Sequence, residues 1–242
     1  GELLATASGG SSAAADRATA EARTALEQLA DPGRLPVARW EPRWGSVVVE
    51  PAEFGAGTEL NDHQLQYGSW VAAASLVVQA DPRSLTQFQD LIDLLIADYA
   101  GTRVVPGASS SLPAERTWSP YEGHSWASGI DRFGAGNNLE SVSESSFAWW
   151  AAARWFTVTG RPDLARPFLG RLAVESAVTG ISWLPDGDRL PSGDARPWSG
   201  VVWSGKVDLD TWFHPSPASA LGIRLLPLGP ASLARYATPA TV

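Results

Sequence analysis

Residues 69–80, SWVAAASLVVQA, are the apolar second half of a stretch that begins at residue 61. Ala and Leu favour a helix, and Asp81-Pro82 supplies a stop signal at its end. A helix that is apolar on all sides does not lie on a surface, so other helices have to surround it. The stretch therefore predicts an all-α fold in which helices are layered or arranged as a toroid.

Several other segments have helical signals. Ser84 and Gln87 form a capping-box pattern ahead of an apolar helical face, and Gly101 ends that segment. Helical composition marks three further segments, at residues 12–30, 138–159 and 163–178. No internal repeat of fixed period is visible, so the helices are expected to pair through loops of unequal length.

The segments between the helices are of two kinds. Residues 40–50, WEPRWGSVVVE, mix aromatic and β-branched residues with a Gly, which predicts a short strand or hairpin. Residues 101–136 form a long loop rich in Gly, Pro and Ser, and residues 180–215 are irregular. Loops longer than about 15 residues in compact domains tend to be functional.

The composition excludes several classes of function. A net charge of -8 and a pI near 4.9, without a Lys/Arg cluster, argue against nucleic acid as a partner. No apolar run approaches the roughly 18 residues of a membrane span. The chain has no Cys, and its three scattered His follow no metal-ligand spacing. We therefore expect no cofactor, no metal and no membrane partner.

The length of 242 residues suits one large domain. We expect a single domain over residues 1–242, a disordered segment at residues 1–10, and a monomer. The sequence contains no Met, not even at position 1, which indicates processing or a piece of a longer protein. No signal peptide is visible to indicate a compartment.

Two glutamates lie near the start of the helix predicted at 138–159. In NNLESVSE, Glu140 and Glu144 are four residues apart, which would place them on one helical face near the positive end of the dipole. With Asn137 as N-cap, Glu140 would be a capping-box glutamate with a purely structural role. That role does not account for Glu144.

A second polar cluster, NDHQLQYG, opens the helix predicted from residue 61. Asp62 has a structural explanation as an N-cap or first-turn acid, but capping does not require the imidazole, amides and phenol that follow it. Such groups can bind a polyol or orient a carboxyl group. The side chains predicted to contact a substrate, here and in the later loops, are His63, Gln66, Tyr67, Tyr121, His124, Trp126 and Asn138.

The loop sequence Gly123-His124-Ser125-Trp126-Ala127 imitates a nucleophile elbow. An elbow needs a buried strand before the Ser and a helix after it, and both flanks here are loop-like. Glycoside hydrolysis fits better, because Asp62, Glu140 and Glu144 could supply a proton donor and a carboxylate that activates water. The 12 Trp residues offer faces on which sugar rings stack, although most indoles in proteins are core.

Five segments, in order, resemble glycoside hydrolase family 81, the inverting endo-β-1,3-glucanases. NDHQLQYGSW resembles the family's N-D-H-H-F-H-Y-G-Y segment, YEGHSWASG its G-H-S-W-A-S-G loop, and NNLESVSES its N-Q-E-S-S-S-E-A helix start. GKVDLDTWF and LGIRLLPLGP resemble its T-W-F and G-I-Q-x-L-P-L pieces. The similarity spans about residues 40–232.

The resemblance implies an (α/α)6 toroid, of which this chain would be only the later part, without the family's N-terminal β-sandwich. It also implies a secreted, extracellular enzyme that acts on β-1,3-glucan. Asp62 matches the general acid, while Glu140 and Glu144 match the pair that supplies the base. Of these two, we favour Glu140 as base and Glu144 as support, with acid and base carboxyls roughly 6.5–9.5 Å apart.

Gln64 and Gln66 depart from the family pattern, which has His at both places. A glutamine can keep one hydrogen bond to a sugar hydroxyl, but it neither titrates nor carries charge. Activity weaker than the family's, or a shifted specificity, is expected.

Two other functions remain open from the sequence. A non-catalytic β-1,3-glucan-binding remnant would keep aromatic side chains for stacking but not turn over. A polysaccharide lyase with Tyr67 or His124 as base ranks last, because few Lys or Arg lie nearby to neutralise a uronate.

Overall fold

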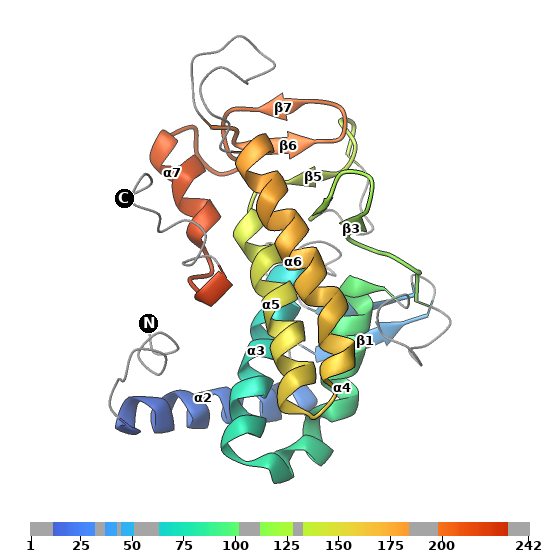
Figure 1. Ribbon diagram of the computed structural model, residues 1–242, viewed down its shortest axis with the longest axis vertical. Helices are drawn as coiled ribbons and strands as arrows, with labels where there is room; N and C mark the ends of the chain where they lie inside the picture. The colour runs from blue at the N-terminus through green and yellow to red at the C-terminus, as the bar shows by residue number, and fades with distance from the viewer. Residues whose placement is uncertain are drawn as a thin grey trace.

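The computed structural model describes residues 12–31, 37–42, 45–50, 63–101, 112–127, 133–183 and 198–231. The long helices are α2 (Ser12–Ala30), α3 (His63–Ala80), α4 (Leu85–Ala100), α5 (Val142–Val158) and α6 (Pro162–Ser182) (Figure 1). The expectation of a mainly helical fold, a partial helical toroid with minor hairpins, is confirmed. The predicted disorder at residues 1–10 lies outside the described residues.

Helices α3, α5 and α6 pack side by side, and α4 packs on α3, while α2 crosses the lower end of the bundle (Figure 1). Short turns connect α3 to α4 and α5 to α6, so each of these pairs runs antiparallel. The apolar helix predicted from residue 61 is α3. Its buried side chains join those of α4, α5 and α6 in the main hydrophobic core.

Helices α3 and α5 approach each other closely at Gly68. A Cβ on Gly68 would lie 3.0 Å from both Cα and Cβ of Ala148, so only a hydrogen fits between the two backbones. Gln64 and Glu144 each lie one helical turn before this contact, and both line the same pocket. The two helices therefore run parallel, and they begin at the same end of the molecule.

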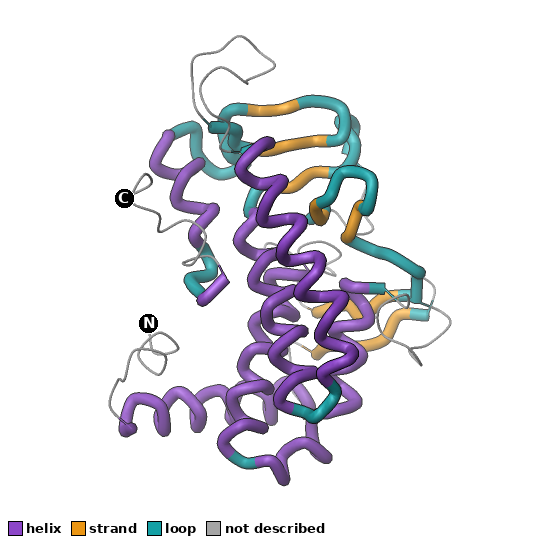
Figure 2. Tube along the Cα trace, viewed as in Figure 1, coloured by secondary structure: helices purple, strands orange, loops and turns teal. Residues whose placement is uncertain are grey.

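The strands form small sheets beside the helices (Figure 2). β1 (Val37–Glu41) and β2 (Ser46–Glu50) form the predicted hairpin, which the buried Asp98 holds by accepting hydrogen bonds from Ser46 and Val47. β3 (Trp118–Ser119) pairs with β4 (His124–Ser125). β5 (Asn138–Leu139), β6 (Val201–Trp203) and β7 (Val207–Asp208) make a third sheet, near α7 (Pro217–Gly222).

One predicted helix start and one predicted side-chain cap are wrong. Residues 138–139 form β5, so α5 begins at Val142 rather than at 138, with Ser141 instead of Asn137 as N-cap. Pairing of Asn138 with Trp203 of β6 draws this segment out of the helix. Ser84 is the N-cap of α4, but the predicted capping box is wrong. The Ser84 side chain caps no backbone group, because Ser84 is the last residue of the short 3-10 helix η1 (Pro82–Ser84) and has a helical conformation.

The Gly68 contact predicts a sharp dependence on side-chain size. Gly68→Val should lower the free energy of unfolding by about 1–3 kcal/mol, because the added methyl groups force α3 and α5 apart. Gly170→Val is the matched control, since no heavy atom lies within 4 Å of a Cβ there and the site is on α6. It should change stability by less than about 0.5 kcal/mol. Urea unfolding checks this, and equal effects in the two variants would contradict the tight contact.

Candidate active site

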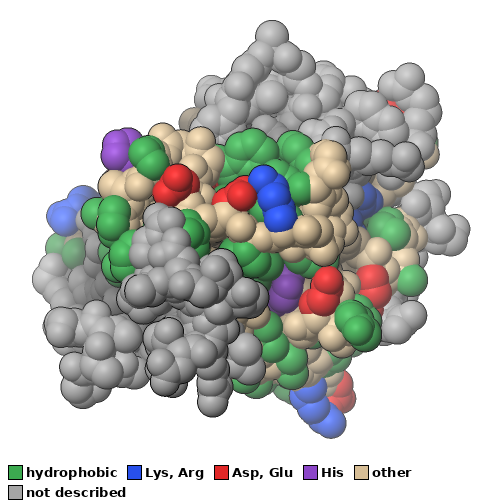
Figure 3. Space-filling view, turned by 90° about the horizontal axis from the view of Figure 1, so that it is seen from above, with side chains coloured by type: hydrophobic (Ala, Val, Ile, Leu, Met, Phe, Trp, Pro, Cys, Tyr) green, Lys and Arg blue, Asp and Glu red, His purple; other side chains and the backbone are tan. Residues whose placement is uncertain are grey.

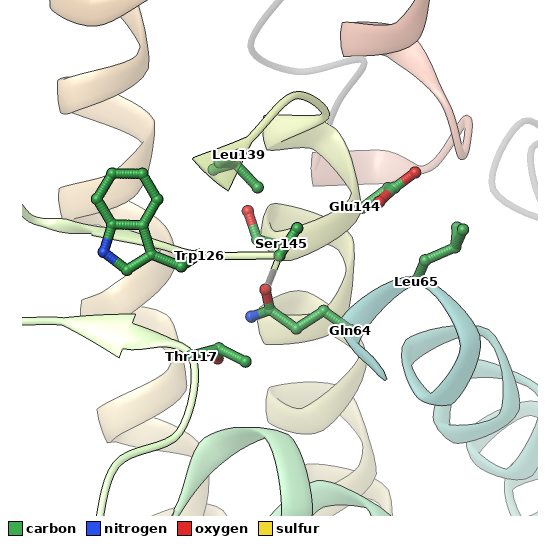
Figure 4. A pocket seen from close by; sticks show the side chains of 8 residues that line it. Gln64, Leu65, Thr117, Trp126, Leu139, Glu144 and Ser145 are labelled. Atoms are coloured by element: carbon green, nitrogen blue, oxygen red, sulfur yellow. The ribbon is translucent and has the colours of Figure 1, made fainter. Parts of the chain in front are cut away.

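A small pocket of about 10 Å³ lies where α3 and α5 begin. Its walls come from these two helix starts, from the loop that carries β3 and β4, and from β5 (Figure 4). The lining residues are Gln64, Leu65, Thr117, Trp126, Ala127, Leu139, Glu144 and Ser145. This pocket brings together parts of the three polar segments NDHQLQYG, GHSWA and NNLESVSE.

Glu144 is one of the residues that line this pocket. It is the third residue of α5, where its backbone N–H donates to the Ser141 carbonyl at 3.2 Å. An acid in a first turn interacts favourably with the helix dipole. The side chains of Ser141 and Ser143 donate to the Ile223 carbonyl at 3.1 and 3.0 Å, so they tie this turn to η2 (Ile223–Leu225).

Glu140 lies outside the helix, contrary to the expectation that both glutamates share one helical face. It follows β5 in a bend, and its Oε1 accepts a hydrogen bond of 2.8 Å from the backbone N–H of Trp212. Glu140 therefore holds the segment after β7 next to the start of α5. The structure brings both glutamates to this end of the molecule but in different local settings.

The start of α3 is described only from His63 onward. Asp62, the predicted general acid, and the His63 side chain lie outside the described part of the chain. Gln64 is buried, and its Nε2 donates to Ser125 Oγ at 3.2 Å. Gln66 Oε1 is buried without a hydrogen-bond partner among the described residues.

Tyr67, a predicted substrate contact, is fully buried. Its hydroxyl donates to the Val47 carbonyl at 2.6 Å, and its ring stacks on Trp70. Tyr67 thereby fastens the β1–β2 hairpin to α3. Tyr121 is the opposite case, since it is 97% exposed at the turn between β3 and β4.

The β4 loop packs tightly behind the pocket. His124 is buried edge-on against Trp126 and Trp183, and its Nδ1 donates to the Ser125 carbonyl at 2.8 Å. Burial lowers the pKa of His124 from its ordinary value, against a smaller opposing effect of that hydrogen bond. Trp126 lines the pocket, and its indole N–H donates to Glu122 at 3.0 Å.

Glu175 on α6 is the residue that sequence reasoning missed. It is fully buried, and its carboxyl group accepts from Ser125, Ser145 and Trp149 directly behind the pocket. Burial raises its pKa more strongly than these hydrogen bonds lower it. The only signal in the sequence was an acid at an otherwise apolar position of the predicted helix 163–178.

A second, larger cleft of about 570 Å³ opens beside the β5–β6–β7 sheet. Phe133, Trp203 and Trp212 form an aromatic cluster in it, with ring centroids 5.1–5.8 Å apart. Lys206 lies over the Trp203 ring, and Trp212 is 56% exposed. Figure 3 shows this end of the molecule, where acidic, basic and hydrophobic side chains adjoin near the centre of the face.

Asn138, another predicted substrate contact, is buried in the β5–β6–β7 sheet, where it pairs with Trp203.

Two further features are absent from the described ranges. No group of three or more acidic or His side chains there is placed to hold a metal ion. Every helix within the same ranges falls short of what a bilayer crossing requires.

The described fold is thus a partial helical toroid with an acid-bearing pocket at the shared start of two parallel helices. Residues 10–239 match the glycosyl hydrolase family 81 C-terminal domain. A solved structure of a mutant glycoside hydrolase family 81 protein from Clostridium thermocellum is similar with a TM-score of 0.80 and 30% identity. The matched region covers 91% of this chain and 31% of the chain in the solved structure. The chain belongs to glycosyl hydrolase family 81, as the sequence resemblance predicted.

Curated relatives are similar over most of this chain. A glucan endo-1,3-beta-D-glucosidase of Acetivibrio thermocellus is 32% identical over 80% of the chain and 25% of its own length. Proteins of the same name from Thermobifida fusca and Glycine max are 30% and 28% identical, over 26% and 31% of their lengths. The chain therefore spans about a quarter to a third of the length of these three relatives.

The buried imidazole predicts a pH effect on stability. With the pKa of His124 lowered in the folded state, the unfolded chain binds its proton more readily. The stability that depends on neutral His124 is therefore complete above the ordinary value of 6.5 and is lost as the pH falls through the lowered value.

We expect the melting temperature of His124→Gln to fall less than that of the wild type between about pH 7 and about pH 5, because that variant has no imidazole to protonate. Calorimetry in matched buffers measures both slopes. If the melting temperature of the two proteins changed equally with pH, His124 would not be held neutral by the folded state.

Proposed function

We propose that this chain carries the acid–base site of an inverting endo-hydrolase of β-1,3-glucan. The single observation that carries the proposal is the parallel start of α3 and α5 at one pocket. Glu144 lines that pocket together with Gln64 and Leu65, which follow Asp62 within three residues. The first described turn of α3, which follows Asp62 in the sequence, and Glu144 of α5 therefore line one pocket.

The proposed reaction is a single displacement. Asp62, as the carboxylic acid, gives its proton to the glycosidic oxygen while the bond from that oxygen to the anomeric carbon breaks. A glutamate takes a proton from water, and the water oxygen forms the new bond on the opposite face of the sugar. The product is the α-anomer, and separation of the two carboxyl groups by roughly 6.5–9.5 Å leaves room for the water.

Glu144 is proposed as the base and Glu140 as its support, the reverse of the assignment that the sequence favoured. Glu144 is the glutamate that lines the pocket. Glu140 Oε1 accepts the Trp212 N–H at 2.8 Å, so one of its oxygens already has a structural partner.

The names of the relatives support the substrate class, since each is called a glucan endo-1,3-beta-D-glucosidase. A long glucan does not cross a membrane, so the proposal includes an extracellular place of action. The proposed partner is the polysaccharide, and the chain is proposed to act as a monomer.

Variants of the two carboxyl groups should differ on an activated substrate. Asp62→Asn should lose about 10²- to 10⁴-fold of the rate on laminarin but keep most of its rate on a 2,4-dinitrophenyl laminari-oligosaccharide, whose leaving group needs no proton. Glu144→Gln should lose rate on both substrates, because water is no longer deprotonated. Release of reducing sugar and of dinitrophenolate measures the two reactions, and NMR should detect the α-anomer first.

The matched control is Asp163→Asn, an exposed acid in the first turn of α6 that pairs with Arg166. This variant should hydrolyse laminarin at the wild-type rate. Wild-type rates in both Asp62→Asn and Glu144→Gln would refute the assignment. A loss in Glu140→Gln but not in Glu144→Gln would restore Glu140 as the base.

Binding without turnover is the second candidate, and the aromatic cleft favours it. Trp212 is 56% exposed there, and Phe133 and Trp203 add two more rings, with Lys206 over the Trp203 ring. Exposed aromatic faces with adjacent polar groups are suited to stacking sugar rings. Gln64 and Gln66, in place of the family's His, are the sequence support for this alternative.

Trp212→Ala should weaken the retardation of the protein in laminarin-containing gels. The expected loss is about 2- to 10-fold in affinity, from an aromatic contribution of about 0.5–1.5 kcal/mol. Tyr121→Ala is the comparison, because Tyr121 is an exposed aromatic that does not line this cleft. Equal losses in the two variants would contradict a role specific to the cleft.

A further inference from the structure

Glu175 is a fully buried carboxyl group in the middle of α6 that neither proposed catalytic role uses. Its Oε1 accepts from the Ser125 backbone N–H at 3.1 Å and from Ser145 Oγ. Its Oε2 accepts from Trp149 Nε1 at 2.6 Å and from Ser125 Oγ at 3.1 Å. Four hydrogen bonds from two other segments therefore meet at one side chain.

This network continues to the walls of the pocket. Ser125 Oγ also accepts from Gln64 Nε2 at 3.2 Å, which links the β4 loop to the start of α3. Ser145 directly follows Glu144, and both line the pocket with Gln64 and Trp126. Through these contacts, α6 is connected to all three segments that carry the proposed catalytic and binding groups.

Burial of a carboxyl group at this position is costly. Removing an acid from water costs free energy that hydrogen bonds only partly return, and an apolar side chain of similar size would avoid the cost. The four hydrogen bonds to Glu175 hold Ser125 of the β4 loop and Ser145 and Trp149 of α5 at set positions relative to α6.

We propose that Glu175 is a positioning residue for glycosidic hydrolysis, which sets the start of α5 and the β4 loop against the start of α3. This inference rests on the proposed function, because it assigns the positioned groups to catalysis. Glu175 itself touches no substrate, and its effect passes through Ser125 and Ser145.

A carboxyl group is specifically required by the donor pattern. Each oxygen faces one N–H that can only donate: the Ser125 amide on Oε1 and the Trp149 indole on Oε2. A glutamine in either orientation would direct its NH2 at one of these donors. Glu175→Gln should therefore shift the network although it preserves size.

Two variants test the proposal, one on α6 and one on α5, and the control is a third variant on α5. Glu175→Gln alters the acceptor, and Trp149→Phe removes one donor. Trp155→Phe is the matched control, since Trp155 is equally buried in the same helix and donates to a different carboxylate, Asp93, at 2.7 Å. Hydrolysis of laminarin is measured for each below its own melting temperature.

In Glu175→Gln and Trp149→Phe we expect kcat to fall about 10- to 100-fold with KM changed less than about threefold, the signature of misplaced reacting groups. Trp155→Phe should keep kcat within about threefold of wild type even if it melts earlier. The proposal is overturned if kcat is unchanged in Trp149→Phe, or if Trp155→Phe loses as much as Trp149→Phe. Should Glu175→Gln fail to fold, Trp149→Phe still decides.

A second measurement separates this inference from the proposed function. Hydrogen–deuterium exchange should rise in Trp149→Phe within residues 124–127 and 142–146, but not in Trp155→Phe. An inactive wild type with this exchange pattern would refute the proposed function and leave the network intact. An active wild type without the pattern would refute the positioning role alone.

Discussion

The parallel contact of α3 and α5 at Gly68 and Ala148 is the constraint on which the rest of the structure depends. Two helix backbones come this close only where one side chain is absent. The contact brings both helix starts to one end of the molecule, since Gln64 and Glu144 each precede it by one turn. In a helical toroid, alternate helices run parallel, so polar residues at their starts gather on one face.

Most of the tryptophans described here serve the core and its buried polar contacts rather than a sugar surface. Trp149 and Trp155 are fully buried in α5 and donate to Glu175 and Asp93. An indole offers a large apolar surface and one N–H, which suits it to a core that contains a few paired carboxylates. Trp212 differs because its ring is largely exposed in the aromatic cleft. The number of Trp residues in the sequence did not distinguish core tryptophans from tryptophans on an exposed surface.

The departure from the family pattern at Gln64 has a structural counterpart. Its amide donates to Ser125, so it joins α3 to the loop that Glu175 holds. Gln66 differs, since its Oε1 lies buried without a partner among the described residues. An unpaired buried acceptor costs about 1–3 kcal/mol, a cost that a bound hydroxyl would remove. The two glutamines therefore differ in what they contribute to the folded chain.

Local sequence was enough to predict the long helices, a strand or hairpin at residues 40–50 and the family, because apolar periodicity, stop signals and short motifs are properties of neighbouring residues. It failed at residues 138–141, where β5 pairs with a strand more than sixty residues later. It also missed Glu175, whose partners come from β4 and α5. Which glutamate lines the pocket and which is hydrogen-bonded to Trp212 was decided only when distant segments packed, since hydrogen bonds between them leave no periodic pattern in the sequence.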